Sequence, residues 1–125
     1  MTRSGDEGRR GDVVRLADID AAAVRIDEIR SKGYEAFMID PILQAATVRY
    51  LEIIGEASGE LSDRFKAAHP DVPFRKMRGF SSFAKHEYWE IRPDLLWVAV
   101  ETMPGIRRGL ASVRAEDPGR RLRRE

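Results

Sequence analysis

The sequence predicts an all-α fold, an up-down bundle of four main helices with one additional short helical turn. Apolar residues recur at three- and four-residue spacing along most of the chain, which is the pattern of helices with one buried face. No alternation of polar and apolar residues is long enough to predict a sheet strand. A chain of 125 residues has room for a single domain with one hydrophobic core.

The N-terminal part of the chain is predicted to contain a tail and the first long helix. Residues 1–11 are rich in glycine, arginine and acidic residues and have no apolar period, so a mobile tail is expected. We expect the helical domain to span residues 12–116 and a basic C-terminal tail to span residues 117–125. The first helix should begin at Asp12 and stop at Gly33. Its buried stripe is predicted to consist of Val13, Leu16, Ile19, Ala22, Ala23, Ile26 and Ile29.

The segment from Tyr34 to Asp40 is predicted to form the short helical turn that leads into the second long helix. That helix should begin at Pro41, because proline is tolerated in the first turn. Gly55 and Gly59 lie inside it and lower its helix propensity, so we expect a neighbouring helix to approach closely there. Its buried positions are predicted to be Leu43, Ala46, Tyr50, Leu51, Ile54, Ala57, Leu61 and Phe65.

Prolines mark the remaining helix boundaries. The run from His69 to Pro73 is the clearest break in the chain, and helix-end capping is the expected role of His69. A third helix is predicted from about Pro73 to Tyr88, with apolar contacts from Met77, Phe80 and Phe83. The last helix should open at Pro93, and Pro104, inside its apolar pattern, should kink it or split it in two.

Composition excludes several classes of protein. The chain has no cysteine, which excludes disulfides, thiolate zinc sites, iron–sulfur clusters and a cysteine nucleophile. Its net charge of +1 argues against wholesale electrostatic binding to nucleic acid but allows a local basic surface. No apolar run approaches a membrane span and the N-terminus lacks a secretory signal, so we expect a soluble, cytoplasmic protein. No metal site and no glycine-rich phosphate loop is apparent, so no cofactor is expected.

Chemically useful side chains gather near the end of the predicted third helix, where His86 and Tyr88 lie two residues apart. Histidine is the side chain best suited to proton transfer near neutral pH. In a regular helix, Ser82 lies four residues before His86 on nearly the same face. The residues alone leave two interpretations open: side chains that cap or pack at a helix end, or a catalytic histidine beside a tyrosine that can be modified.

Four segments occur in an order that is typical of one family. They are L-E-I-I-G-E-A from Leu51 to Ala57, then L-S-D-R-F, then H-P-D-V-P-F-R, and finally F-S-S-F-A-K-H-E-Y. Together they resemble the HepT-like branch of the HEPN superfamily, the small helical ribonuclease toxins, and the resemblance runs from about Tyr34 to Leu110. It implies a homodimer whose facing sites cleave RNA, a tRNA or an mRNA, without a metal ion. We expect the third and last helices to line the dimer interface.

The family motif places arginine and asparagine before a histidine and a tyrosine. By the resemblance, the histidine corresponds to His86 and the tyrosine to Tyr88, whereas Ser81 and Ser82 stand where the family has arginine and asparagine. A serine hydroxyl lacks the permanent charge and the bidentate geometry of a guanidinium. We therefore expect a site with His86, Ser81 and Ser82 to be weakly active or inactive.

Three basic residues of the third helix, Arg75, Arg78 and Lys85, are candidates for contacts with RNA phosphates. Arg78 lies eight residues before His86, about 12 Å along a helix axis, and within one chain it is a distant replacement for the missing arginine. Across a dimer interface, Arg75 or Arg78 could approach the histidine of the other subunit.

In the family, the tyrosine that matches Tyr88 receives adenylate groups from a partner nucleotidyltransferase, the antitoxin of HepT/MntA-type toxin–antitoxin systems. Each AMP would add charge and bulk beside the site and repel an RNA backbone. The leading hypothesis is therefore a ribonuclease toxin in which His86 transfers protons and Tyr88 is the target of the antitoxin. Two alternatives stay open: a catalytically dead HEPN dimer that binds a nucleotidyltransferase, and a plain dimerisation module.

Overall fold

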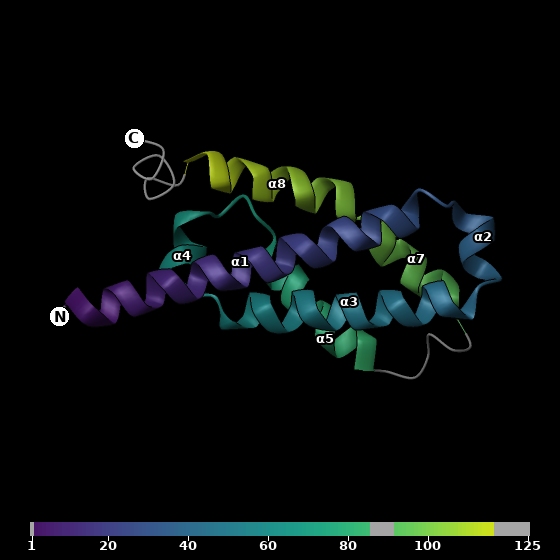
Figure 1. Cartoon of the computed structure of the whole chain (residues 1–125), viewed down its shortest axis with the longest axis horizontal. Helices are drawn as coiled ribbons and strands as arrows, with labels where there is room; N and C mark the ends of the chain where they lie inside the picture. Colours follow the sequence, from purple (N-terminus) through teal and green to yellow (C-terminus); the bar gives the residue numbers. More distant parts are fainter. Residues whose placement is uncertain (1, 86–91, 117–125) are drawn as a thin grey trace.

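The computed structural model describes the backbone of residues 2–85 and 92–116 and the side chains of residues 8–85 and 92–113. Every regular element in these ranges is an α-helix, and the helices form an up-down bundle, which confirms the predicted fold class (Figure 1). The predicted C-terminal tail, residues 117–125, lies outside the described residues.

The first helix, α1, spans Thr2–Arg30 (Figure 1). It begins at Thr2 instead of Asp12, so residues 2–11, for which the sequence predicted a tail, are part of the helix. From Ile19 onward, the predicted stripe is buried. The prediction of a buried Val13 is wrong, because its side chain is 42% exposed.

A short helix and a capped turn lead into the second long helix. Helix α2, Tyr34–Met38, follows Gly33, whose φ of +93° lies in the left-handed region that favours glycine. Helix α3, Pro41–Glu60, begins at the predicted proline. The Asp40 carboxylate accepts hydrogen bonds from two backbone N–H groups of the first turn of α3, the shorter at 2.9 Å, and so caps the helix.

Helix α3 ends earlier than predicted, and a separate helix, α4, follows over Asp63–Ala68. The prediction of one helix continuing through Phe65 is therefore wrong. The Ser62 hydroxyl caps α4 by accepting a hydrogen bond from the backbone N–H of Phe65 (3.1 Å). The Asp12 carboxylate of α1 accepts hydrogen bonds from the Ser62 N–H (2.8 Å) and the Ser62 hydroxyl (2.7 Å). A contact between residues 50 positions apart thus stabilises the break, and local periodicity carries no sign of it.

The C-terminal half of the chain follows the predicted order. Helix α5, Phe74–Lys85, comes after the proline-rich break and packs against α3. Helix α7, Pro93–Glu101, begins at the predicted proline, and helix α8, Met103–Glu116, continues after Thr102. The split at Thr102, just before Pro104, is one of the two outcomes that the sequence predicted. The Thr102 hydroxyl donates to a carbonyl oxygen at the end of α7 (2.6 Å), which satisfies part of that helix end.

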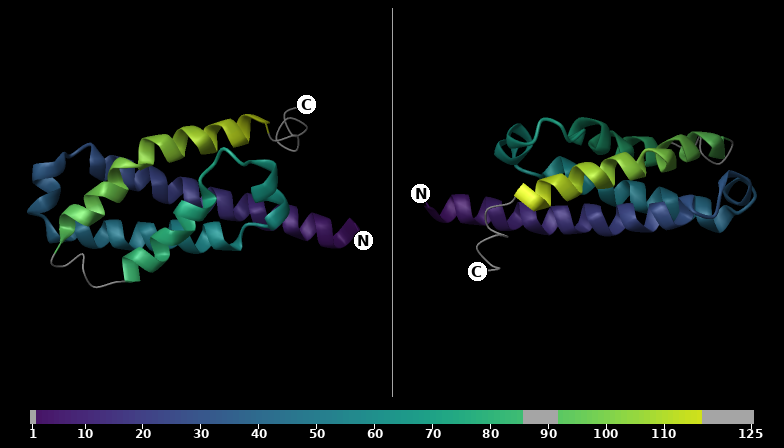
Figure 2. Two further views of the ribbon diagram at one scale, coloured as in Figure 1. Left: turned by 180° about the vertical axis from the view of Figure 1, so that it is seen from behind. Right: turned by 90° about the horizontal axis from the view of Figure 1, so that it is seen from above.

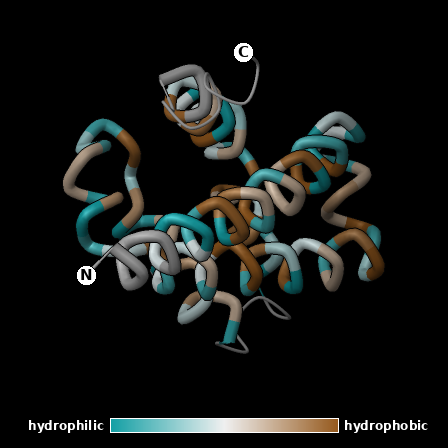
Figure 3. The backbone as a smooth tube through the Cα atoms, turned by 60° about the vertical axis from the view of Figure 1, so that its left-hand side comes forward, coloured by the Kyte–Doolittle hydropathy of each residue, from teal (hydrophilic) through white to brown (hydrophobic). Residues whose placement is uncertain are grey.

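The helices enclose one hydrophobic core. Helices α1 and α3 lie side by side and antiparallel, α5 crosses α3, and α8 lies along α1 (Figure 2). Hydrophobic residues gather in the middle of the bundle, where these helices face one another (Figure 3). Within the described ranges, no helix combines the length and the apolar character that crossing a bilayer requires. The largest fully buried side chains include Phe37, Ile26, Leu51, Ile54, Met77, Leu96 and Met103.

Candidate functional site

Helix α5 presents an apolar face to the core and a polar face to solvent. Its buried residues are Phe74, Met77, Phe80 and Ala84, which recur at three- and four-residue spacing. Phe83 is partly buried and packs against the same core. The apolar contacts predicted for this helix are thus confirmed, and most of the predicted site residues on α5 lie on its polar side.

The closest approach between α3 and α5 occurs at Gly55. A Cβ atom on Gly55 would lie 2.3 Å from the backbone nitrogen of Ser81 and 2.6 Å from the Ser81 Cβ. Such distances are shorter than real carbon contacts, so the approach requires glycine. At Gly59, a Cβ atom would lie 3.4 Å from Nε of Arg78, which is a tight but ordinary contact. The predicted close approach of a neighbouring helix is confirmed at Gly55, where it fixes the backbone of Ser81 against α3, whereas Gly59 meets only the side chain of Arg78.

The serine pair lies on α5 with the two hydroxyls in different surroundings. Ser81 is partly buried, and its hydroxyl donates a hydrogen bond to the carbonyl oxygen of Arg78 (3.1 Å). Ser82 is exposed, because successive residues of a helix are turned about 100° from each other. Since the proton of the Ser81 hydroxyl is engaged within the helix, this group is left as an acceptor, and an acceptor does not stabilise negative charge on a phosphoryl oxygen.

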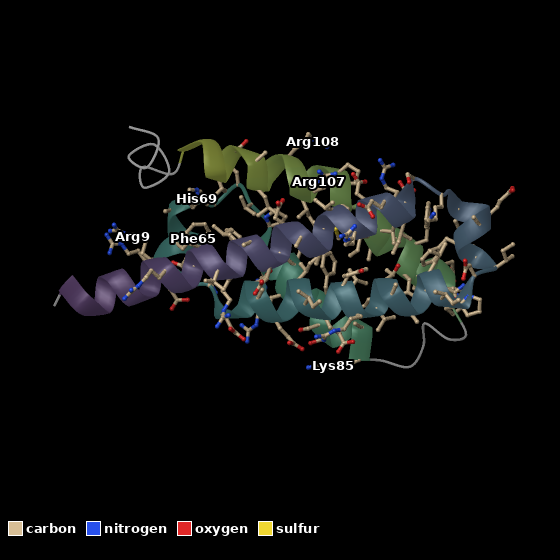
Figure 4. All side chains as sticks on the ribbon, viewed as in Figure 1. Arg9, Phe65, His69, Lys85, Arg107 and Arg108 are labelled. Carbon is tan, nitrogen blue, oxygen red and sulfur yellow. The ribbon has the colours of Figure 1, made fainter. Side chains whose placement is uncertain are left out.

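His86 and Tyr88 lie outside the described residues, so their predicted roles stay predictions. The described chain reaches the end of α5 at Lys85, whose exposed side chain points away from the bundle, and resumes at Arg92 (Figure 4). The Arg92 guanidinium donates two hydrogen bonds to the Asp94 carboxylate, at 3.0 and 2.9 Å. This pairing holds the pKa of the Asp94 carboxyl below its usual value. The arginine that directly follows the segment 86–91 is therefore already engaged with a carboxylate.

A cavity of about 530 Å³ lies where the end of α3, helix α4 and the start of α5 meet. Arg75 and Arg78, two of the predicted phosphate contacts, line it together with Lys66 of α4. The third predicted contact, Lys85, lies at the opposite end of α5 and does not line it (Figure 4). The rest of the wall consists of Ser58, Pro70, Val72, Pro73 and Phe74.

Ser58 and Lys66 were not predicted to be neighbours of the two arginines. Ser58 is 1% exposed, and its hydroxyl has no hydrogen-bond partner in the part of the chain that the structure describes. Lys66 lines the cavity because the chain breaks at Ser62 and turns into α4. The pair Ser62-Asp63, a frequent start of a helix, is the sequence signal that could have predicted this break.

His69 ends α4 as predicted, because its backbone N–H donates a hydrogen bond to the carbonyl oxygen of Lys66 (3.2 Å). Its ring packs against that of Phe65, with centroids 4.6 Å apart (Figure 4).

Among the described residues, no group of three or more histidine, aspartate or glutamate side chains is placed to hold a metal ion.

The fold and helix α5 define a class of small all-α proteins. In this class an amphipathic helix packs on a glycine of the second long helix, here Gly55 of α3, and a histidine and a tyrosine follow it in the sequence. The family model described as "Ribonuclease HepT-like" matches residues 19–113, from the buried part of α1 into α8. The chain belongs to this HepT-like, HEPN-type ribonuclease family.

Individual relatives carry ribonuclease names. A probable ribonuclease HepT of Thermococcus cleftensis is 37% identical over 94 residues, which cover 74% of this chain and 86% of that protein. A putative RNase of Caldanaerobacter subterraneus subsp. tengcongensis is 35% identical over 60% of this chain and 67% of its own length. A putative RNase of Methanocaldococcus jannaschii is 34% identical, over 66% and 77% respectively. No solved structure matches the chain at a significant level.

Proposed function

We propose that this chain is the RNA endonuclease toxin of a toxin–antitoxin pair, that it acts without a metal ion, and that a partner nucleotidyltransferase neutralises it by adenylylating Tyr88. The family match carries the proposal, because it includes the whole of α5 and the segment 86–91 that follows it. The relatives named as ribonucleases support RNA as the substrate. We place the protein in the cytoplasm, where its RNA substrate and its partner would meet.

The chemistry requires proton transfer and stabilisation of charge on the phosphoryl group. His86 takes the proton from a ribose 2′-hydroxyl, and the 2′-oxygen attacks the adjacent phosphorus. The bond from phosphorus to the 5′-oxygen breaks, and that oxygen takes a proton from a second acid, which in a dimer is the partner subunit's His86. The products are a 2′,3′-cyclic phosphate and a 5′-hydroxyl, and no redox partner is needed.

The serines at positions 81 and 82 should make this reaction slow. The Ser81 hydroxyl donates to the carbonyl oxygen of Arg78, so it offers no donor to the phosphoryl oxygens in this rotamer. Losing one donor that acts in the transition state typically costs about 100- to 1,000-fold in rate. We therefore propose that the sequence as it stands is a weakened or inactive form of the enzyme.

Restoring the family residues tests the proposal directly. The variant Ser81→Arg/Ser82→Asn should arrest growth on expression and should cut RNA, whereas the present sequence should do either weakly or not at all. The substitution keeps the Cβ atom at position 81, so the contact with Gly55 should survive. Adding His86→Ala to the restored variant should abolish both effects. A restored protein that folds, stays harmless and leaves RNA intact would sink the nuclease assignment.

Adenylylation of Tyr88 is tested separately. Incubation with the neighbouring nucleotidyltransferase and ATP should add about 329 Da to the intact mass for each adenylate. Tyr88→Phe should prevent the addition, and Tyr50→Phe is the matched control on α3. If the Tyr88→Phe variant is adenylylated to the same level, Tyr88 is not the target of the transferase.

A catalytically dead HEPN dimer that only binds a nucleotidyltransferase is the second candidate. The engaged hydroxyl of Ser81 favours it, because the position that carries arginine in the family motif offers no charge here. The two candidates differ in the sequence as it stands: a weakened enzyme should cut RNA slowly and lose this cleavage in His86→Ala, whereas a dead scaffold should bind the transferase and show no cleavage that depends on His86.

A further inference from the structure

The cavity at the junction of α3, α4 and α5 has the features of an anion site. We propose that it binds a phosphate group of RNA through Lys66, Arg75, Arg78, the hydroxyl of Ser58 and the N-terminus of α5. This inference rests on the proposed function for the identity of the ligand, but the site itself is separate from His86 and from the serine pair. It would hold the substrate and would take no part in the bond-breaking step.

Three cationic side chains line one cavity, and among the described residues only Lys66 has a carboxylate partner. Among the described residues, no ion pair involves Arg75 or Arg78, and no acidic side chain lines the cavity. Lys66 has only a loose contact with Asp63, 3.7 Å between Nζ and Oδ1, and the Asp63 side chain is fully exposed. Like charges gathered without counter-charges repel one another, so an anion that enters the cavity relieves this repulsion.

The side chain of Arg78 is positioned by α3. Gly59 offers no side chain, and the aliphatic part of Arg78 lies over it, with Cγ and Cδ each 3.6 Å from the place that a Cβ would occupy. The stem of Arg78 is therefore packed against α3 next to Ser58, while its exposed guanidinium stays available.

Neutral donors complete the site. Helix α5 begins at the cavity wall, and its hydrogen bonds start with the N–H of Met77 donating to the carbonyl oxygen of Pro73 (3.0 Å). The N–H groups of Arg75 and Lys76, in the first turn, therefore have no carbonyl partner within the helix. Ser58 belongs to the same wall, and its hydroxyl is buried without a hydrogen-bond partner among the described residues, which is costly unless a ligand provides one.

Phosphate is the anion that suits this donor set. Guanidinium groups bind phosphate oxygens with a paired, planar geometry, and helix N-termini bind phosphate groups. Arg78 and Arg75 precede Ser81 by three and six residues, or about 5 and 9 Å along the helix axis. An RNA strand that follows α5 would thus meet the cavity and the candidate cleavage site in turn.

Inorganic phosphate tests the cavity without any RNA. In the full chain, titration with phosphate should shift the backbone amide signals of Arg75 and Lys76 in a nitrogen–proton NMR spectrum, whereas chloride at equal ionic strength should not. Ser58→Ala should leave the unfolding midpoint unchanged or raised, because its hydroxyl has no partner to lose, and should weaken phosphate binding about three- to ten-fold. Unshifted amides, or unchanged phosphate affinity in both Ser58→Ala and Arg75→Gln/Arg78→Gln, would overturn the site.

Binding of RNA tests the source of the phosphate. The probe is a fluorescent RNA of mixed sequence with 2′-O-methyl groups, which removes the nucleophile and prevents cleavage. Arg75→Gln/Arg78→Gln should weaken binding by about ten-fold or more and lower the slope of log affinity against log salt by about 1.4. The matched control is Arg64→Gln/Arg108→Gln, which removes the same charge from exposed positions of α4 and α8 that do not line the cavity.

The outcomes separate this inference from the proposed function. If the two double variants lose RNA affinity equally, the loss comes from the change in net charge, and the proposed site is overturned. Binding of phosphate without any difference in RNA affinity would overturn the assignment to RNA. Comparing RNAs with a 5′-phosphate and a 5′-hydroxyl distinguishes a terminal phosphate from an internal one. Failure of the restored variant to cut RNA, with the cavity still selective for RNA, would sink the nuclease and leave this site intact.

Discussion

Asp27 shows how a single carboxylate holds two helices together. Its Oδ1 accepts a hydrogen bond from Nε of Arg30 on the same helix (2.8 Å), and its Oδ2 accepts one from Nη1 of Arg107 on α8 (2.6 Å). Arg107 lies on the side of α8 that faces α1 (Figure 4). The hydrogen bond from Arg30, with that from Arg107, holds the pKa of the Asp27 carboxyl below its usual value. The ionised form is thus favoured by the fold.

This lowered pKa predicts a specific loss of stability in acid. The contribution of Asp27 is fully present above the carboxyl pKa of the unfolded chain, about 3.9, and is lost as the pH falls through the lower pKa of the folded protein. Asp27→Asn should therefore lower the free energy of unfolding at pH 7 by about 1 kcal/mol or less, since the pair is partly exposed. The difference between the two proteins, measured by urea unfolding, should shrink below about pH 4.

The control is Glu28→Gln, which removes a solvent-exposed pair with Arg25 and should change the unfolding midpoint little at either pH. A difference between wild type and Asp27→Asn that grows as the pH falls would contradict the role given to Asp27.

Substitution of glycine by alanine should have opposite effects on stability at Gly55 and at Gly79. Gly55→Ala places a Cβ atom 2.3 Å from the backbone of Ser81 and must push α5 away from α3, so we expect a loss of about 2–3 kcal/mol despite the better helix propensity of alanine. At Gly79 nothing lies within 4 Å of the new atom, and Gly79→Ala should gain about 0.5–1 kcal/mol. Thermal and urea unfolding measure the stability of both variants. Equal changes in stability would contradict the close approach of α5 to α3 at Gly55.

The break between helices α3 and α4 depends on one carboxylate of α1, that of Asp12. Asp12→Ala removes the acceptor of two hydrogen bonds from Ser62 and should destabilise the protein by about 1–2 kcal/mol, as measured by urea unfolding. Because Lys66 reaches the cavity through this break, the same variant should also weaken the response to phosphate. Asp18→Ala, an exposed position on α1, is the control and should change neither property.

The elements that the sequence predicted well are those with local signals. Asp40-Pro41 and Arg92-Pro93 mark helix starts by chemistry within a few residues, and the split near Pro104 follows from its missing N–H. The start of α4 escaped prediction because the apolar period was followed through the local start signal Ser62-Asp63, and because Asp12, which accepts the hydrogen bonds that hold the break, lies far away in the sequence. The exposure of Val13 escaped it because apolar spacing shows which side of a helix can be buried and not whether another helix covers it at each turn.

The candidate site, too, could be predicted only in part. The grouping of Arg75 and Arg78 could be predicted from helix spacing. Their meeting with Lys66 and Ser58 could not, because it depends on how α3, α4 and α5 pack. The roles of His86 and Tyr88 came from family resemblance and stay predictions, since both residues lie outside the described part of the chain.

The proposed chemistry predicts that the protein assembles as a dimer. A site formed by the His86 residues of two subunits requires a homodimer, and we expect its interface to be lined by α5 and by the predicted last helix, which the structure divides into α7 and α8. Light scattering at micromolar concentration should give about twice the chain mass of 14.2 kDa. Val98 on α7 is 64% exposed and Val14 on α1 is 52% exposed, so the two are matched apolar surface residues on different helices. Val98→Arg should shift the mass toward the monomer because a charge buried at an interface is unfavourable, and Val14→Arg should leave the dimer intact.

The assembly and the chemistry are linked by this pair of variants. If two subunits form one site, Val98→Arg introduced into the restored Ser81→Arg/Ser82→Asn protein should reduce RNA cleavage in proportion to the loss of dimer, and raising the protein concentration should recover part of it. Val14→Arg in the same background should cut as before. Full cleavage by a protein that light scattering shows to be monomeric would mean that one subunit supplies every group that the reaction needs.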